Sequence, residues 1–409
     1  MLSRRRLIGT VACVVTIALG LAGCGSSSKN TAGGTTNTTT GNKATGSPLV
    51  VGLICSCSGN PLANNLSERV YQAFVSWAND NGGIEGHPIQ LITENDNFVP
   101  ATSISEVHTL VADHIVALVD ESQFDITWAS YIQSTGIPVI GAQTASEPFF
   151  QNPDFFAEAM TEDALFTAVI STGKSQGAKT IGELYCAESV ICQQGIAPFK
   201  AAGQALGVSV PLFASISATA PSYASQCIAA QQAHVDALYV ADASTVIARV
   251  AQNCTQQGYK PMYLIDGESL SPFLPTTPGI SENLAAPVPG LPYFATDQPV
   301  VKTMVDALNK YAPGLQSDPN YNEVVSEAWP AGIMLQAAAK AGGLTSSTTP
   351  TATLLQNGLH SFNGETLGGW APPLTFKAGQ ANPVHCWFVS ALKNGVYSMP
   401  QGQTPQCMK

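Results

Sequence analysis

Short apolar runs alternate with amphipathic segments along most of this chain. Residues 49–54 form the first run, and its length and composition are typical of a strand that is buried on both faces. In residues 67–81, Val70, Phe74 and Trp77 recur at the i, i+4 and i+7 spacing of a helix. The same alternation predicts further strands at residues 89–92, 115–119, 137–140, 180–185, 208–213, 237–240 and 262–265.

This alternation predicts the fold class. Strands that are buried on both faces and separated by helices belong to parallel sheets. About 360 residues follow Pro48, which is more than one simple core accommodates. We therefore expect an α/β chain with two doubly wound parallel-sheet lobes. Because such sheets bind ligands beyond the carboxyl ends of their strands, we also expect a cleft there.

The N-terminal segment is typical of an export signal. Arginines at residues 4–6 precede an uncharged run over residues 7–22, which is shorter than the about 20 apolar residues that span a bilayer. The run ends in Leu21-Ala22-Gly23-Cys24, the pattern of a bacterial lipobox. We predict a signal peptide over residues 1–23 and a lipid on Cys24. The alternative is a small-residue cleavage site with an incidental Cys, and a resemblance to twin-arginine signals leaves the export route open.

The segment after the signal has the composition of a tether. Between Gly25 and Pro48 it contains no large apolar side chain, so it cannot bury enough surface to offset its ordering entropy. Residues 24–47 are therefore predicted to be a flexible tether. Since no later run reaches 18 apolar residues, we expect an extracytoplasmic protein that is attached to the membrane by its lipid alone.

The charge balance argues against several partners. The chain has 17 basic and 28 acidic residues, and three of the basic residues lie in the predicted signal. An acidic body without basic clusters argues against nucleic acid and against anionic membrane surfaces.

The cysteines indicate disulfides. Eight remain once Cys13 and Cys24 are set aside, and an even number in an exported chain is typical of a disulfide framework. Cys55 and Cys57 either close a small ring or stay reduced. No Cys-x-x-Cys pair or His cluster accompanies them, so we expect neither a metal nor a cofactor. The spacing favours the pairs Cys186 with Cys192, Cys227 with Cys254, and Cys386 with Cys407.

Three parts of the chain, in the same order, resemble a known family. Residues 79–86, with the sequence Asn-Asp-Asn-Gly-Gly-Ile-Glu-Gly and followed by the predicted strand at 89–92, are similar to a family signature. Residues 136–140 resemble a second landmark, and residues 328–343 with Phe362-Asn363-Gly364 resemble a late helix and loop. The chain resembles the type 1 periplasmic solute-binding proteins of the leucine/isoleucine/valine-binding kind, which serve ABC importers.

The resemblance implies two lobes that are joined by three crossovers and close over a small polar solute. It also implies a monomer that is not an enzyme and that contacts the permease subunits of an ABC importer. The crossovers would lie near residues 160–162, 292–296 and 362–369. The N-lobe would comprise residues 48–161 and 296–362, and the C-lobe residues 162–295 and 363–409.

The resemblance also implies a ligand site. In the amino-acid binders of this family, loop hydroxyls and backbone N–H groups hold the ligand carboxylate, and acidic side chains hold its ammonium. The carboxylate would be held by Ser122, Thr144, Ala145 and Ser146. The ammonium would be held by Glu162 or Asp163 and by Glu268. Asp242 follows the predicted strand at 237–240 and is expected to line the same mouth. The solute would be an amino acid or a related amide or amine, while helix-capping hydroxyls and solvated loop acids remain the alternatives.

Two departures from the family pattern concern the solute. The family usually has Tyr-Gly-x-Gly where this chain has Cys192-Gln193-Gln194-Gly195. It usually has Pro-Leu-Ser-Gly where this chain has Cys55-Ser56-Cys57-Ser58-Gly59. Both changes place cysteines at the expected cleft rim and suggest a solute other than an ordinary branched-chain amino acid.

Functions of other classes find less support in the sequence. Gly267-Glu268-Ser269-Leu270-Ser271 lacks the last glycine of a hydrolase nucleophile elbow. His108 and His114 are six residues apart and do not have the i, i+4 spacing of a zinc protease helix. A solute sensor that signals to a membrane receptor remains the alternative to an importer subunit, because both need the same two lobes.

Overall fold

The computed structural model describes four stretches of the chain, residues 43–59, 63–141, 146–188 and 190–408. All lie in one compact unit that extends from Gly41 to Lys409. Cys24, Thr144, Ala145 and most of the predicted tether lie outside the described residues. Within the described stretches, no helix has the length and apolar character that crossing a membrane requires.

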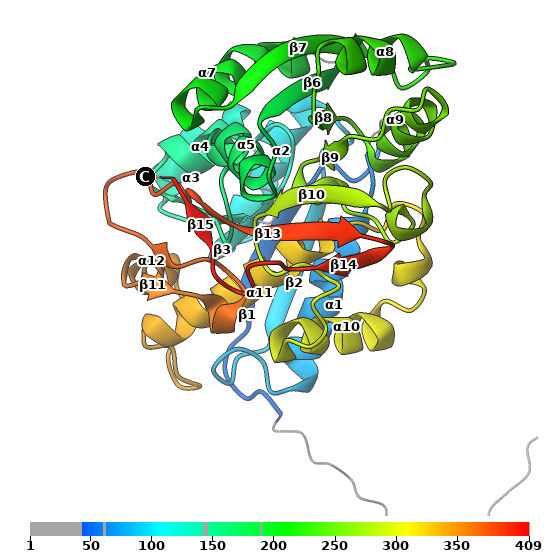
Figure 1. The fold of residues 1–409 in the computed structure, drawn as a ribbon. Coiled ribbons are helices and arrows are strands. Elements are labelled where there is room, and N and C mark those ends of the chain that lie inside the picture. Colours follow the sequence, from blue (N-terminus) through cyan, green and yellow to red (C-terminus); the bar gives the residue numbers. More distant parts are fainter. Residues whose placement is uncertain (1–42, 60–62, 142–145, 189, 409) are drawn as a thin grey trace, which may run out of the picture. The chain divides into compact units, whose positions relative to one another are not determined.

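Five parallel strands form the first sheet, in the order β2-β1-β3-β4-β5 (Figure 1). The central strand β1 pairs on both sides and is almost fully buried, which agrees with its apolar run. The strands are β1 (Leu49–Cys55), β2 (Ile89–Asn95), β3 (Ala117–Glu121), β4 (Val139–Gly141) and β5 (Phe155–Phe156).

Helices from both ends of the chain share one hydrophobic core with this sheet. We call the sheet and these helices the first lobe. The α-helices are α1 (Leu66–Asp80), α2 (Pro100–Ala112), α3 (Ala129–Thr135), α4 (Glu147–Gln151), α10 (Pro299–Tyr311), α11 (Val325–Ala341) and α12 (Ala352–His360). The 3-10 helices are η1 (Asp125–Thr127), η5 (Leu315–Ser317) and η6 (Leu367–Gly369).

The second sheet has eight strands. Strands β6 to β10 are parallel, in the order β10-β9-β8-β6-β7, and β6 to β9 correspond to predicted strands, whereas β10 was not predicted. Strand β13 pairs antiparallel with β10, and both β14 and β15 pair antiparallel with β13, which the sequence pattern did not predict. The strands are β6 (Thr180–Cys186), β7 (Ser209–Ile216), β8 (Ala237–Ala241), β9 (Met262–Leu264), β10 (Asn283–Val288), β13 (Cys386–Lys393), β14 (Val396–Ser398) and β15 (Gln406–Cys407).

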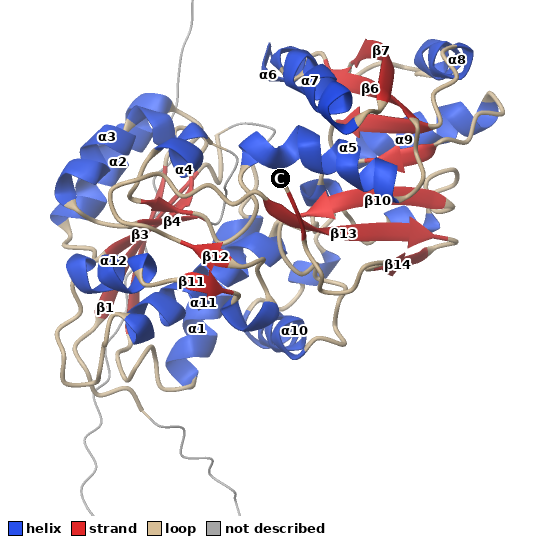
Figure 2. Ribbon diagram, turned by 60° about the vertical axis from the view of Figure 1, so that its left-hand side comes forward, coloured by secondary structure: helices blue, strands red, loops and turns tan. Residues whose placement is uncertain are grey.

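Helices flank both faces of the second sheet (Figure 2). In β8, Ala237 and Tyr239 belong to one hydrophobic cluster, whereas Leu238 and Val240 belong to another. Alternate residues of a strand point to opposite faces, so this division accounts for the continuous apolar run. We call this sheet and its helices the second lobe. The helices are α5 (Leu165–Ser175), α6 (Val190–Gln194), α7 (Ile196–Leu206), α8 (Ala224–Gln232), α9 (Ser244–Gln256), η2 (Glu162–Ala164), η3 (Gly267–Ser269) and η4 (Leu274–Thr276).

The segment before β13 packs with the first lobe. It contains the small antiparallel pair β11 (Asn363–Glu365) and β12 (Leu374–Thr375), and Trp370 and Phe376 lie in the core of the first sheet. The sequence analysis assigned residues 363–409 to the second lobe, and the structure differs from that assignment before β13. The apolar residues of this segment follow neither a helical nor a strand period, so their core contacts could not be read from spacing.

Four disulfides are present, and three of them are the pairs that the spacing favours. Cys186–Cys192 links β6 to α6, Cys227–Cys254 links α8 to α9, and Cys386–Cys407 links β13 to β15. All three lie in the second lobe. The fourth, Cys55–Cys57, closes the small ring that the sequence left as one of two possibilities.

Candidate functional site

A cavity of about 510 Å³ lies where strands of both lobes end. From the first lobe it is lined by Ser56 after β1 and by Glu121 at the end of β3. From the second lobe it is lined by Asp266 and Glu268 in the segment after β9 and by Glu162 in η2. This position agrees with the rule that parallel sheets bind ligands beyond the carboxyl ends of their strands. Its volume is within the usual range for small-molecule sites.

Two glutamates of the first lobe are buried in the cavity wall. Glu121 is 8% exposed and Glu327, on α11, is 2% exposed. Each has an Oε1 atom without a hydrogen-bond partner among the described residues. Burial raises the pKa of both carboxyls well above the usual range, and the nearby Glu268 raises them further.

Three acids of the second lobe complete the wall. Asp266 caps η3, because its Oδ1 accepts a hydrogen bond of 3.0 Å from the backbone N–H of Ser269. Glu162 and Glu268 reach solvent in the cavity, although protein atoms surround them. Desolvation and the neighbouring Asp266 raise the pKa of Glu268 to about 7. Desolvation, followed by the charge of Glu268, raises the pKa of Glu162 well above its usual value.

A buried hydrogen-bond network fixes the first-lobe loops. Asp96 is fully buried, and its Oδ2 accepts hydrogen bonds from the hydroxyls of Ser56 at 2.8 Å and Ser122 at 2.6 Å. The Ser56 hydroxyl in turn accepts from the backbone N–H of Gln123 at 3.0 Å. The loops after β1, β2 and β3 are thereby joined, which positions Glu121.

Several of the residues that the sequence singled out lie away from the cavity wall. Ser122 does not line the cavity, and its hydroxyl holds the loop network instead. Ser146 donates a hydrogen bond to Asp125, and Asp163 bonds Nε2 of His385 at 2.6 Å. Asp242 does not line the cavity either. Thr144 and Ala145 lie outside the described residues.

The wall also contains acids that the sequence analysis did not choose. Glu121 directly precedes the candidate Ser122, Asp266 lies two residues before the candidate Glu268, and Glu327 directly precedes the predicted late helix. One signal could have identified Glu121 and Asp266, because each follows a buried strand and therefore lies at the ligand-binding edge of its sheet. Glu327 carries no such signal, since only the packing of α11 brings it to the cavity.

The ionisable side chains described in the cavity wall are all acidic. Five carboxyl groups line the cavity, and the described lining residues include no Lys, Arg or His. Repulsion among buried carboxylates favours their protonated forms, whereas a cation in the cavity favours the ionised forms. The arrangement is therefore suited to binding a group that carries positive charge or donates hydrogen bonds.

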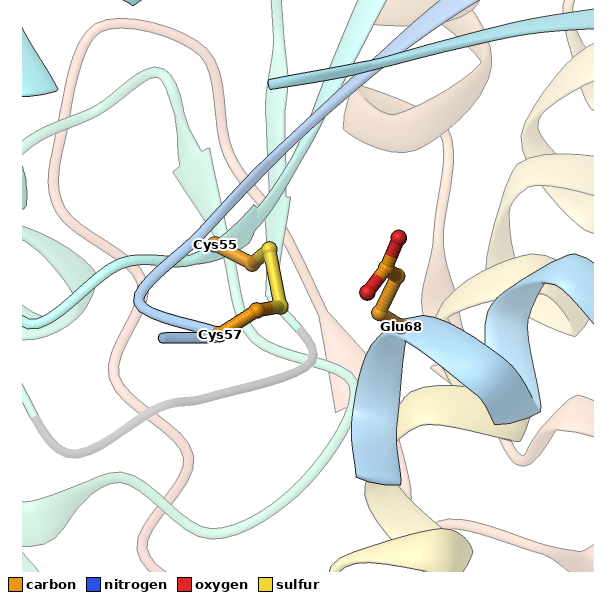
Figure 3. A group of neighbouring side chains, drawn as sticks. All are labelled: Cys55, Cys57 and Glu68. Atoms are coloured by element: carbon orange, nitrogen blue, oxygen red, sulfur yellow. A yellow bond between two sulfur atoms is a disulfide. The ribbon is translucent and has the colours of Figure 1, made fainter. Parts of the chain in front are cut away.

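Cys55 and Cys57, which also line the cavity, form a second group of side chains with Glu68 (Figure 3). Their potential ligand atoms lie within 4.8 Å of one another, which is the spacing of a metal site. The two sulfurs are joined in a disulfide, however, and only thiolates serve as metal ligands. In this state the group cannot hold a metal ion through its sulfurs.

Comparisons with known proteins agree with this description. The family model of the periplasmic binding proteins matches residues 48–396, and the chain therefore belongs to that family. Its two lobes have the type 1 fold of these proteins. No curated protein matches the sequence significantly.

Solved structures share the fold at low sequence identity. A branched-chain amino acid ABC transporter protein from Thermus thermophilus with bound valine is 14% identical, with a TM-score of 0.73 over 88% of this chain and 97% of that chain. A fatty acid ABC transporter substrate-binding protein from Thermomonospora curvata is 18% identical, with a TM-score of 0.66 over 88% and 95%. A solute-binding protein from R. palustris in complex with benzoate is 14% identical, with a TM-score of 0.65 over 88% and 97%.

Proposed function

We propose that this chain is an extracytoplasmic, lipid-anchored solute-binding protein of an ABC importer. It captures a small polar solute, an amino acid or a related amide or amine, and delivers it to the permease subunits. The observation that carries this proposal is the carboxyl-lined cavity at the strand ends of both lobes. Family membership supports the solute-binding class and the extracytoplasmic location.

The solute contacts follow from the cavity wall. Glu162 and Glu268 are proposed to hold the amino group of the solute, and Glu121, Asp266 and Glu327 to add to the negative field around it. The relatives' ligands, valine, benzoate and a fatty acid by their names, support the idea that this fold accommodates chemically different solutes. The side chains of the wall would then select the solute.

A thermal-shift screen tests the proposal. The full chain in detergent is heated with amino acids, amides, amines and short carboxylates, each at high concentration. A ligand at 100 times its dissociation constant stabilises the protein by about 2.7 kcal/mol, which gives a clear increase in the melting temperature. If no member of the panel shifts the melting temperature, the proposal fails for this solute class.

Calorimetry on Glu268→Ala with the best ligand of the screen then tests whether Glu268 contacts the solute. Removal of a charged partner from a buried pair costs about 2 to 5 kcal/mol of binding free energy. Asp163→Ala is the matched control, because Asp163 neighbours Glu162 in the chain but does not line the cavity. Affinity of Glu268→Ala within about twofold of the parent would place Glu268 outside the contact.

The anchor has its own test. Cys24→Ala should transfer the protein from the membrane fraction to a soluble or unprocessed form. Equal retention of the variant in the membrane fraction would contradict the lipid anchor. Transport assays with and without a partner ABC permease would separate an importer subunit from a sensor.

A further inference from the structure

Two glutamate oxygens in the cavity wall indicate which kind of group the solute presents to the first lobe. Glu121 and Glu327 are both more than nine-tenths buried, they line the cavity, and each has one carboxyl oxygen without a partner among the described residues. A buried carboxyl oxygen without a hydrogen-bond partner is unfavourable, because it has lost its contact with water and gained none in return. Both positions therefore favour a ligand that donates hydrogen bonds to the first lobe.

The second lobe presents acceptors of its own. Glu162, Asp266 and Glu268 come from η2 and η3, so the cavity has carboxyl groups on two sides. Glu268 influences the pKa of both Glu121 and Glu327, which shows that its charge acts across the cavity. One ammonium group on each side would relieve this repulsion, because an opposite charge favours the ionised carboxylate.

A single metal ion does not fit this distribution. Mg²⁺ and Ca²⁺ need several oxygens that converge on one point at about 2.0 to 2.6 Å. Among the described residues, the one group of three potential ligand atoms within 4.8 Å is Cys55, Cys57 and Glu68, not the cavity acids. The cavity of about 510 Å³ is also within the usual range for small-molecule sites, which suits a molecule of several carbon atoms.

A zwitterion is also a poor match for the described wall. The carboxylate of an amino acid would stand among five acidic side chains, and the described lining offers only neutral donors, with no Lys, Arg or His, to offset their repulsion. We infer that the solute is an organic cation with at least two amino groups and no carboxylate, of the diamine or polyamine class, held between the acids of the two lobes. This inference rests on the proposed solute-binding function and narrows its ligand.

Binding of such a cation should be coupled to the release of protons from the cavity carboxyls. The groups that act on Glu268 or respond to it are Asp266 beside it, Glu162 on η2, Glu121 on β3, Glu327 on α11 and the hydroxyl of Tyr239 on β8. None of them is basic. Since the pKa of Glu268 is about 7, the cation binds a carboxylate that is only partly ionised at pH 6. Affinity should therefore increase from pH 6 to pH 8, and binding should release protons.

The test compares defined probes by calorimetry on the full chain in detergent. The probes are 1,4-diaminobutane, spermidine, 1-aminobutane, 1,4-butanediol and leucine. The diamine or spermidine should bind about tenfold or more tighter than the monoamine, the diol and leucine. If leucine binds as tightly as the diamine or tighter, the inference is overturned while the proposed function stands. If neither 1,4-diaminobutane nor spermidine binds, the inference also fails. If no amino acid or amine of the whole panel binds, the proposed function fails as well.

Variants of the first-lobe glutamates test which side chains hold the diamine. Glu327→Gln should weaken diamine binding by about 30-fold or more and should reduce monoamine binding less. Asp242→Asn is the control, since Asp242 is a half-buried acid whose pKa is also raised but which does not line the cavity, and diamine affinity should stay within about twofold. Glu121→Gln provides a second variant if Glu327→Gln does not fold. Unchanged diamine affinity in folded Glu327→Gln and Glu121→Gln, or a diamine affinity that decreases from pH 6 to pH 8, would contradict the inference.

Discussion

The two lobes have the same α/β construction but are stabilised differently. The first lobe has one continuous core that contains the fully buried side chains of Trp128, Trp329 and Trp370. The core of the second lobe is divided by its sheet into separate clusters on the two faces, a further small cluster contains the buried Trp387 of β13, and three disulfides bridge its elements. A core that is divided into separate clusters gains less from packing than one continuous core, and covalent links make up part of the difference.

The packing of α1 against α11 shows what the first lobe depends on. The rings of Phe74 and Trp329 meet edge to face with centroids 5.3 Å apart. Gly332 on α11 permits this approach, because a Cβ at that position would lie 2.4 Å from the Phe74 ring. In such a closely packed interior, a change in side-chain volume has a large effect on stability.

Trp329→Ala should therefore produce the largest loss of stability. Truncation of a buried Trp or Phe to Ala costs about 3 to 5 kcal/mol, because the cavity collapses only partly. Hydrogen exchange should show the loss in β1 and β3 and leave β6 and β8 protected. Ile126→Ala is the control, since Ile126 is 59% exposed and should change stability by less than about 0.5 kcal/mol. Equal loss of protection in both sheets would contradict the comparison.

Removal of the Cys227–Cys254 disulfide should produce the next largest effect, in the other lobe. The two cysteines are 27 residues apart, and closure of such a loop is worth about 3.5 kcal/mol in the chain-entropy account. Cys227→Ala with Cys254→Ala should lower the midpoint of urea unfolding for the second sheet. Cys55→Ala with Cys57→Ala is the control, because their two-residue separation predicts only about 1.5 kcal/mol. A larger loss in the control pair would show that loop closure is not the reason.

Much of the fold could be predicted from the sequence, since parallel strands are local apolar runs. The sequence predicted strands at or overlapping β1, β2, β3 and β4, and likewise β6 to β9. It did not predict β13, which pairs antiparallel with β10 although about 100 residues separate them in the chain. Pairings of this kind are decided by tertiary packing, which leaves no periodic signal in the strand itself.

The candidate site was predictable only in part. Glu162 and Glu268 were chosen by resemblance and do line the cavity, whereas their roles stay a proposal. Ser122 was chosen on the same basis, but its hydroxyl is used by the buried Asp96. Sequence position indicates which loops lie at the strand ends, whereas the direction of each side chain depends on hydrogen bonds between distant segments. For that reason Glu327 could not be found from the sequence.

The pH dependence of stability should also separate the lobes. In the second lobe, Glu183 on β6 is 1% exposed, and burial raises its pKa to about 7 from 4.5. The folded state then binds this proton more tightly than the unfolded state. Stability therefore decreases as the pH rises from about 4.5 to 7, by at most about 1.4 kcal/mol per pH unit.

Glu183→Gln removes this contribution. The variant should be more stable than the parent at pH 7 by about 1 to 3 kcal/mol and nearly equal to it at pH 4.5. Urea unfolding of the second sheet at both pH values measures the difference. Glu282→Gln is the control, because Glu282 is an exposed partner of Lys260 and an exposed pair contributes about 0 to 1 kcal/mol. A variant that is less stable at pH 7 would show that the Glu183 carboxylate has a favourable role.

The smallest expected effect applies equally to both lobes. Gly136 ends α3 in the first lobe and Gly207 ends α7 in the second, with φ of 71° and 66°. A Cβ at either glycine would contact nothing within 4 Å, so the cost of Ala is the left-handed backbone alone, about 1 to 2 kcal/mol. Gly136→Ala and Gly207→Ala should therefore cost the same within about 0.5 kcal/mol, each in its own lobe by hydrogen exchange. The penalty is local, so neither the tryptophan core nor the disulfides should change it. A much larger cost for one glycine would mean that its helix end is coupled to the packing of that lobe, and the contrast between the lobes would then extend to their surfaces.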